Sequence, residues 1–285
     1  MSENPLVSIG MPVYNGEKHL RLALESLLAQ SYSNLEIIVS DNASTDATNM
    51  IVQEFIGRDQ RIRYYRQIKN LGPAANFDFT LEQASGEYFM WAASDDLWDK
   101  NWVITLLQDL STKKVVLAFG QLVSIDEDSG QIIRKFNDFD FSGIRISRLA
   151  KYFMTDEYSG KACLIYGLFR TSFLRERKKL SDYTNLDLGA DMHFVFDCVQ
   201  YGYVSINKTV IFYKRMPETK ENKANVLQRI MNSVLIIGQI KYFIKYIKVP
   251  IHLFDRLIIA ILMPVKYIKT LFYKNIRNIK ILLIR

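Results

Sequence analysis

The sequence EYFMWAASDDLW, residues 87–98, carries the pattern that decides the predicted fold. It is apolar and aromatic through Met90 and Trp91 and ends at two adjacent carboxylates, Asp95 and Asp96. An apolar run that stops at paired acids is typical of a buried strand that delivers charge to the edge of a sheet. Adjacent carboxylates repel each other unless a cation or hydrogen-bond donors share them, and Mg²⁺ or Mn²⁺ suits such a pair. The alternative is that one of the two acids caps a following helix.

The segments before this strand alternate between strand and helix patterns. Strand-like runs lie at 6–11, 34–41 and 61–66. One helical pattern runs from 17 to 30, a second ends at about 55 and a third ends at 84. Strands that alternate with helices of this length imply crossover connections and parallel pairing. We therefore expect an α/β fold with a mostly parallel sheet flanked by helices.

Three features fall at the carboxyl ends of the predicted strands: the loop at residues 12–15, Asp41 and Asp95. Ligands of open α/β sheets bind at these ends, so one site could use all three. Neither GxGxxG after the first strand nor GxxxxGK[ST] occurs in the sequence. A nucleotide would therefore have to be held by other means.

The composition indicates a folded protein without a disulfide framework. Of the 285 residues, 49% are hydrophobic, which allows a substantial core. The two cysteines, Cys163 and Cys198, have no CxxC spacing. The first ten residues have neither a basic nor an apolar signal region, so we expect a cytoplasmic protein without a secretory signal.

The positive charge is concentrated at the C-terminus. Residues 222–285 contain twelve Lys or Arg and one acid, a net charge of +11, so residues 1–221 carry −4 of the total of +7. We expect a domain at 1–221 and a separate basic, helical extension at 222–285.

The extension has amphipathic helical patterns. Lys241, Lys245 and Lys248 recur at helical spacing opposite a set of apolar residues, Ile240, Phe243, Ile244 and Ile247. The longest uninterrupted apolar run, 257–265, is half of what a spanning helix needs. Such helices lie at bilayer interfaces and prefer anionic lipid. The alternative is a helical cap on the domain, and binding to nucleic acid is disfavoured because the apolar face is broad.

Five motifs in order resemble glycosyltransferase family 2. They are VSIGMPVYN (7–15), VSDNASTD (39–46), NLGPAAN (70–76), ASGEYFMWAASDDLW (84–98) and GADMHF (189–194). The resemblance covers about residues 5–215. It implies the GT-A fold, which is Rossmann-like, and an inverting enzyme that uses a nucleotide sugar.

The resemblance also implies roles for particular residues. Nucleotide and donor sugar would be held by Pro12, Val13, Tyr14, Asn15, Asp41, Asn70, Gly72 and Asp95. Asp95 and Asp96 would hold a divalent metal, Mn²⁺ or Mg²⁺, and Asp191 would be the catalytic base. A carboxylate suits the base-binding position of Asp41 because it can accept a hydrogen bond from an imide N–H of uracil type.

The sequence departs from the family pattern at three positions. Asn42 stands where many members have glycine or a second acid after Asp41, and Ala93 replaces the first acid of a frequent Asp-Ser-Asp-Asp motif. Ala190 stands where a glutamate often precedes the base. The metal shell would then depend on Asp95 and Asp96, with diphosphate oxygens supplying much of the rest.

Three further polar residues lie near these motifs. His193 follows Asp191 by two positions, and a lone histidine is more often structural than catalytic. Lys214 and Arg215 follow the last predicted strand. They could contact a diphosphate or form a solvated basic pair.

Together these features predict a metal-dependent inverting glycosyltransferase of the hexosyl- or N-acetylhexosaminyl-transferase class. We expect it to use a nucleotide-diphosphate sugar, with a UDP-sugar as the expected donor. The expected acceptor is a lipid-linked saccharide in surface polysaccharide synthesis, and the expected location is the inner face of the cell membrane, on anionic lipid. The alternatives are a sugar-phosphate nucleotidyltransferase and a non-catalytic, membrane-bound sugar-nucleotide binder.

Overall fold

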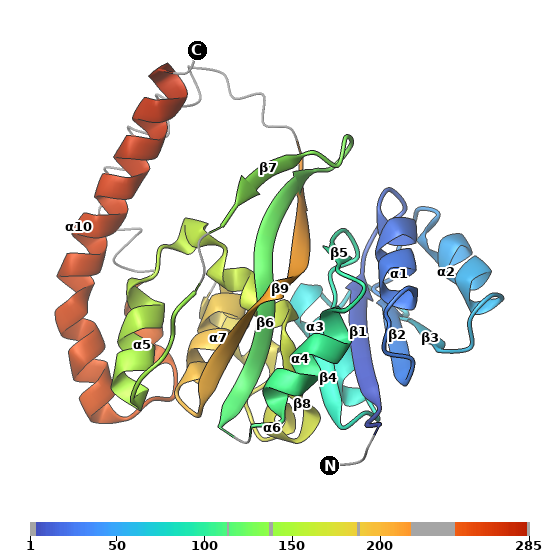
Figure 1. The fold of residues 1–285 in the computed structure, drawn as a ribbon, viewed down its shortest axis with the longest axis horizontal. Helices are drawn as coiled ribbons and strands as arrows, with labels where there is room; N and C mark the ends of the chain where they lie inside the picture. Colours follow the sequence, from blue (N-terminus) through green and yellow to red (C-terminus); the bar gives the residue numbers. More distant parts are fainter. Residues whose placement is uncertain (1–3, 113, 137–138, 187–188, 218–242, 284–285) are drawn as a thin grey trace.

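A computed structural model describes residues 4–112, 114–136, 139–186, 189–217 and 243–283 (Figure 1). A sheet of nine strands forms its centre, and eight of them follow the order β3-β2-β1-β4-β8-β6-β9-β5, with β7 paired to β6. Helices flank the sheet, which confirms the α/β prediction.

The first half of the sheet is parallel, as the alternating pattern predicts. Its strands are β1 (Val7–Val13), β2 (Leu35–Asp41), β3 (Ile62–Arg66) and β4 (Tyr88–Trp91), and their crossover helices are α1 (Leu20–Leu28), α2 (Thr48–Ile56) and α3 (Pro73–Glu82). β1 and β2 are buried along their full length, because both lie in the middle of the sheet and helices cover them.

The second half of the sheet is mixed. It contains β5 (Leu97–Trp98), β6 (Val115–Asp126), β7 (Ile132–Lys135), β8 (Leu168–Arg170) and β9 (Tyr203–Met216). The pairs β4–β8, β8–β6, β6–β7 and β5–β9 are antiparallel, whereas β6 and β9 run parallel. The parallel character predicted for the sheet therefore belongs mainly to its N-terminal half.

Helical segments of the second half are mostly short. They are α4 (Trp102–Leu110), α5 (Arg145–Met154), α6 (Thr171–Arg175) and α7 (Ala190–Val199), with 3₁₀ turns at Glu157–Ser159, Lys161–Tyr166 and Leu180–Leu186. The long helix α10 (Leu253–Leu283) follows and runs along the edge of the molecule opposite α1 and α2 (Figure 1).

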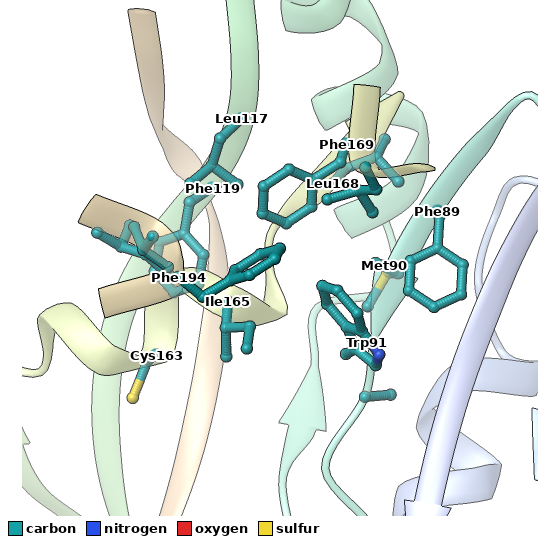
Figure 2. Packing of buried hydrophobic residues seen from close by; sticks show 14 of the residues in the cluster. Phe89, Met90, Trp91, Leu117, Phe119, Cys163, Ile165, Leu168, Phe169 and Phe194 are labelled. Atoms are coloured by element: carbon teal, nitrogen blue, oxygen red, sulfur yellow. The ribbon is translucent and has the colours of Figure 1, made fainter. Parts of the chain in front are cut away.

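Trp91 is the centre of an aromatic cluster that joins β4 to its neighbours (Figure 2). Its ring lies 5.0 Å from that of Phe89, 6.2 Å from that of Phe169 on β8 and 5.5 Å from that of Phe194 on α7. The indole N–H donates to the Phe77 carbonyl oxygen at 3.0 Å, so the buried polar atom has a partner. The apolar part of residues 87–98 therefore holds α7 and α3 against the end of β4.

The C-terminal extension is helical at 243–248 and 253–283, with a break at 249–252, and it packs on the domain. Helix α10 lies against α5. The Lys266 ammonium lies 3.1 Å from Glu157 Oε2, and Asp255 pairs with Arg145 at 3.1 Å. The predicted boundary at 221/222, with Ile240 and Lys241, lies outside the described residues. Among the described helices, no segment has the length and hydropathy to cross a membrane.

Gly120 on β6 tests the packing of this core. A Cβ at this position would overlap the Trp102 ring and the Val210 carbonyl oxygen. We expect Gly120→Ala to lower the free energy of unfolding by about 1–3 kcal/mol, measured by urea denaturation, because the crowded atoms belong to a rigid ring and to backbone.

Gly57→Ala is the matched control. Gly57 has ordinary helical backbone (φ −64°), and its nearest neighbour would be a carbonyl oxygen at 3.4 Å. This variant should be unchanged or slightly more stable. Equal stability of Gly120→Ala and wild type would contradict the packing described here.

Candidate functional site

The predicted strand ends meet at one edge of the sheet. Val13 pairs with Asp41 in register, and Gly10 of the same strand pairs with Trp91 of β4. The loops that follow β1, β2 and β4 therefore lie side by side. Pro12 and Val13 belong to β1 and are buried, whereas Tyr14 and Asn15 are exposed.

Pro12 is tolerated inside this central strand for a geometric reason. Residues of a strand face their two neighbours alternately, and Gly10 faces β4 through its carbonyl, which accepts from the Ala92 N–H at 2.8 Å. Pro12 faces the same side, where the pairing with β4 has ended. Its missing N–H therefore costs no ladder hydrogen bond.

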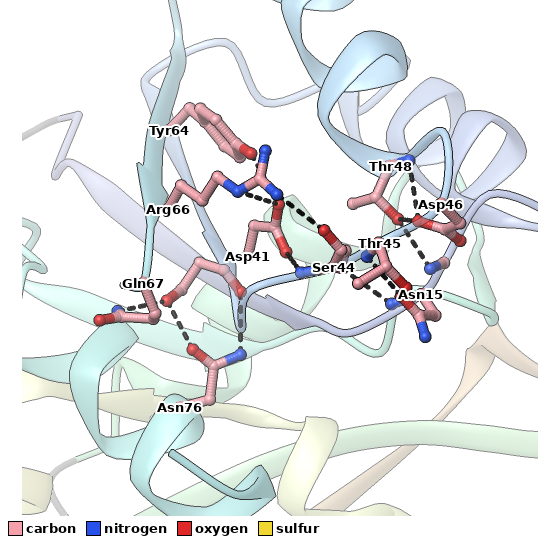
Figure 3. Close-up of polar contacts among 12 residues, drawn as sticks. Asn15, Asp41, Ser44, Thr45, Asp46, Thr48, Tyr64, Arg66, Gln67 and Asn76 are labelled. Carbon is pink, nitrogen blue, oxygen red and sulfur yellow. Dashed lines mark hydrogen bonds and ion pairs between the residues drawn. The ribbon is translucent and has the colours of Figure 1, made fainter. Parts of the chain in front are cut away.

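Asn15 joins the loop after β1 to the loop after β2 (Figure 3). Its backbone N–H donates to Ser44 Oγ at 2.9 Å, and its Oδ1 accepts from the Thr45 N–H at 2.9 Å. Asn15 (φ 50°) and Ala43 (φ 62°) both have left-handed backbone, which non-glycine residues rarely adopt. The cross-loop hydrogen bonds hold these two residues in that conformation, and such positions are frequent at functional sites.

Asp41 lies behind this corner and is fully buried. Its Oδ1 accepts from the Ser44 N–H at 2.8 Å, and its Oδ2 accepts from the Tyr64 hydroxyl at 2.7 Å (Figure 3). The Arg66 guanidinium lies 3.9 Å from Oδ2 and also donates to the Ser44 carbonyl. Both carboxylate oxygens are thus engaged within the protein.

Sequence reasoning missed Tyr64 and Arg66. They stand two residues apart on β3, so they project on the same face, and the pairing of β3 with β2 brings them to Asp41. The period-two spacing was visible in the sequence, but its partner strand was not.

Asn42 explains one departure from the family pattern. Its Nδ2 donates to Asn70 Oδ1 at 2.9 Å and to the Gly72 carbonyl at 3.1 Å, and its Oδ1 accepts from the Leu71 N–H at 2.8 Å. A carboxylate could accept but not donate here. Gly72, in the loop that Asn42 holds, has a positive φ of 83°, which favours glycine. A Cβ at this position would meet no neighbouring atom, so the backbone conformation and not crowding explains the glycine.

The paired acids have different environments. Asp95 is exposed, and Asp96 has no exposed surface. Asp96 Oδ1 accepts from the Arg215 backbone N–H at 2.8 Å, and Oδ2 lies 3.6 Å from Lys214 Nζ. Burial raises the pKa of Asp96 to about 6, against the lowering effect of Lys214. The helix-cap alternative is wrong, because the two-residue strand β5 follows Asp96 and α4 begins only at Trp102.

Asp191 is the second residue of α7 and is partly buried. Its Oδ1 accepts from the Met192 N–H at 2.8 Å, and burial raises the pKa of its carboxyl. Of the three predicted site carboxylates, Asp96 is the one that Lys214 pairs with, and the Lys214 charge also opposes the rise in the pKa of Asp191.

Arg215 points elsewhere. Its guanidinium contacts His19 Nδ1 at 3.1 Å, and His19 Nε2 lies 3.2 Å from Glu127, which also pairs with Lys18 at 2.6 Å. Arg215 is buried and about a third of the Lys214 side chain is exposed, so the two residues do not form a solvated pair: Lys214 alone is open to solvent.

His193 lies in the interface with the C-terminal extension. It is buried, with its ring 4.6 Å from that of Tyr246. Burial lowers the pKa of the imidazole to about 4, so it is neutral at pH 7. This environment favours the structural role.

One exposed carboxylate in this region could bind a divalent cation. Among the described residues, no group of three His, Cys, Asp or Glu side chains lies close enough together to hold a metal ion. Asp95 is accessible, whereas the oxygens of Asp96 face Arg215 N–H and Lys214. Mg²⁺ sites with one protein carboxylate and several phosphate oxygens are common, so Asp95 with a diphosphate would fit such an ion.

Comparison with known proteins gave concordant matches. Residues 8–184 match the sequence model of the family described as Glycosyl transferase family 2. An uncharacterized glycosyltransferase of Haemophilus influenzae is 36% identical over 128 residues, which cover 45% of this chain and 51% of that protein. Glycosyltransferase GlyG of Streptococcus pneumoniae is 34% identical over 141 residues, covering 50% and 46%. The chain thus matches about half the length of these relatives.

Two solved structures share the fold at low identity. Staphylococcus aureus TarS (residues 1–349) in complex with UDP has a TM-score of 0.58 at 19% identity, covering 82% of this chain and 66% of that one. The mannosyltransferase PcManGT of Pyrobaculum calidifontis, in complex with GDP-Man and Mn²⁺, has a TM-score of 0.60 at 18% identity, covering 97% and 72%. These matches confirm the predicted GT-A architecture.

Tyr64→Phe tests the support of Asp41. The variant removes one donor from a buried carboxylate, so we expect the free energy of unfolding to fall by about 1–3 kcal/mol in urea denaturation. Tyr14→Phe, at an exposed tyrosine, should stay within about 0.5 kcal/mol of wild type. The same small change in both variants would show that the Tyr64 hydroxyl does not support Asp41.

Proposed function

The chain belongs to glycosyl transferase family 2, and from this premise we propose that it transfers a sugar from a nucleotide-diphosphate sugar to a hydroxyl group with inversion. One observation carries the proposal: Asp95 and Asp96 follow β4 at the sheet edge where the loops after β1 and β2 also lie, and the Lys214 ammonium lies 3.6 Å from Asp96 Oδ2. The charged diphosphate of a donor needs a cation beside it, and the acceptor hydroxyl needs a group that takes its proton.

Asp191 is proposed as the general base. Attack by the acceptor oxygen on the anomeric carbon requires loss of the hydroxyl proton, and a carboxylate on the opposite face of the sugar can take it. The raised pKa of Asp191 supports this role, because a base with a pKa closer to the working pH binds the proton more strongly.

The metal requirement is proposed to rest on Asp95. A divalent ion there would act as a Lewis acid on the diphosphate, and the Mn²⁺ complex of PcManGT supports this choice. Asp96 is then a positioning residue for β9 and Lys214.

The nucleoside is proposed to bind over the corner formed by Tyr14, Asn15 and Arg66, with Asn70 and Gly72 beside the donor. Asp41 would act indirectly, by holding Tyr64 and the Ser44 turn. TarS was solved with UDP and with UDP-GlcNAc, which supports a UDP-sugar of the hexosyl or N-acetylhexosaminyl class.

Two other activities are less well supported. A nucleotidyltransferase would need a mobile basic loop after β1, whereas here Asn15 and Gly16 are hydrogen-bonded to Ser44 and Thr48. A non-catalytic sugar-nucleotide binder is favoured only by Ala93 and the engaged oxygens of Asp96. It predicts nucleotide binding without transfer or hydrolysis.

A lipid-linked saccharide acceptor at the inner membrane surface is proposed from the outer face of α10. Its exposed apolar residues recur at helical spacing, and each is 54–74% exposed: Leu253, Phe254, Leu257, Ile261, Val265 and Ile268. Lys266 and Lys269 face the domain instead, where they donate to the carbonyls of Thr155 and Met154. A helix with apolar residues outward and lysines inward suits an apolar surface.

Charge near the start of α10 supports anionic lipid as this surface. A cavity of about 390 Å³ precedes α10 and is lined in part by Ile251, Arg145 and Arg256. Phosphate headgroups would be attracted to the guanidinium groups of Arg145 and Arg256 while Leu253 and Phe254 enter the acyl boundary. In this proposal residues 1–221 carry the chemistry and residues 222–285 hold it at the membrane.

Asp191→Asn tests the base. The amide cannot accept the proton, so we expect transfer to fall by at least about 100-fold while the donor still binds, because general-base catalysis contributes about 10²–10⁴-fold. Transfer is measured with a panel of UDP-sugars and GDP-mannose, and donor binding by calorimetry. Asp182→Asn, an exposed acid in the preceding 3₁₀ turn, is the control and should keep wild-type rates. Normal turnover by Asp191→Asn would refute the assignment.

The double variant Leu257→Gln, Ile261→Gln tests the outer face of α10. Cosedimentation with vesicles of phosphatidylcholine and phosphatidylglycerol should weaken by roughly tenfold or more, because each inserted side chain contributes apolar burial. Ile132→Gln, Ile133→Gln, at exposed positions of β7, should bind as wild type does. Equal binding by all three proteins would exclude this face as the membrane contact.

A further inference from the structure

The backbone of Lys214 is held by strand pairing on β9. Lys214 pairs with Ser124 of β6, and the preceding Tyr213 pairs with Leu97 of β5. Successive side chains of a strand point to opposite faces, which separates Lys214 from Arg215. The ammonium group of Lys214 is thereby directed to Asp96, while the Arg215 guanidinium contacts His19.

The Lys214 ammonium forms an ion pair with Asp96 but no close hydrogen bond to it. The distance of 3.6 Å to Asp96 Oδ2 is an ion-pair distance and too long for a good hydrogen bond. Asp96 Oδ2 is buried and has no hydrogen-bond partner in the described part of the chain. About a third of the Lys214 side chain is exposed, so its N–H donors can reach an additional anion.

Lys214 is the cation paired with the acids that follow β4. Its ammonium lies 3.6 Å from Asp96 Oδ2, and Asp95 is the neighbouring, exposed acid. An anionic ligand beside these two carboxylates would be repelled unless a cation offset their charge, and Lys214 supplies one. The adjacent cation on β9, Arg215, is committed elsewhere, because its guanidinium contacts His19.

We propose that the Lys214 ammonium binds the diphosphate of the donor and neutralises the charge that develops on it during transfer. This rests on the proposed glycosyltransferase function. The bond between the anomeric carbon and the β-phosphate oxygen breaks, and its electron pair stays on that oxygen, next to Lys214. The acceptor oxygen forms the new bond to the anomeric carbon, and its proton passes to Asp191. Many family members have an additional acid at the position of Ala93, which would help to hold a divalent cation. In this chain that acid is absent, and the Lys214 ammonium supplies positive charge at the same site.

In this assignment Asp96 has a defined task. Its carboxylate binds the Arg215 N–H, which sets the end of β9, and attracts the Lys214 ammonium. Asp96 is therefore a positioning residue, and the Arg215 N–H and the Lys214 ammonium stabilise its carboxylate in the buried position.

Calorimetry with nucleotide fragments tests the proposal. Wild type, Lys214→Gln and Lys214→Arg are titrated with UDP, GDP, uridine and guanosine, each in Mg²⁺ and in EDTA. A hydrogen bond from a charged donor is worth about 10- to 100-fold in affinity, so Lys214→Gln should lose that factor for the bound nucleoside diphosphate and keep its affinity for the nucleoside. The loss should be larger in EDTA, and Lys214→Arg should recover most of the affinity. Lys135→Gln, which removes an exposed positive charge on β7, should match wild type.

The outcomes separate this proposal from the proposed function. Equal affinities of wild type and Lys214→Gln for the diphosphate would overturn the role of Lys214 and leave the function intact. Parallel losses for the nucleoside and the diphosphate would also overturn it, because they indicate a distorted site, and Lys214→Arg with a wild-type melting curve controls for folding. A wild-type protein that binds neither UDP nor GDP would overturn the function itself.

Discussion

A carboxylate without exposed surface joins the two halves of this molecule. Asp96 closes the segment that begins in β4, and it binds the backbone of Arg215, which is 119 residues away in the sequence. A buried carboxylate that lacks donors costs several kcal/mol, so the end of β4 and the end of β9 constrain each other. Lys214, the residue before Arg215 on β9, is thereby held with its ammonium 3.6 Å from Asp96 Oδ2.

Aromatic packing supplies the rest of the frame. Trp91 lies four residues before Asp95 and contacts Phe194 of α7, three residues after Asp191. One ring contact thus sets the relation between the two carboxylates that would serve the donor and the acceptor. Because rigid aromatic rings transmit position well, the apolar half of residues 87–98 is as important for the site as its acids.

Departures from the family pattern become intelligible through their neighbours. Asn42 replaces a frequent glycine or acid, and its amide donates and accepts in one loop, which no carboxylate could do. Ala93 removes an acid from an edge where a lysine is present. The orientation of α10 is also explained by its neighbours. Lys266 and Lys269 donate to carbonyl groups of the domain, and Lys266 also pairs with Glu157. The apolar face of α10 therefore points outward.

The α/β class, the alternation of the first four strands, the meeting of their ends at one edge and the family are readable from the amino-acid sequence. These follow from local periodicity and from ordered motifs, which need no knowledge of distant partners. The folded chain was needed to find that the second half of the sheet is mixed, that Asp96 is buried while Asp95 is exposed, and that Tyr64 supports Asp41. It was also needed to find which face of α10 is covered. The reason is physical: burial, ion pairing and strand register depend on residues far apart in the chain, and periodicity along one segment does not contain them.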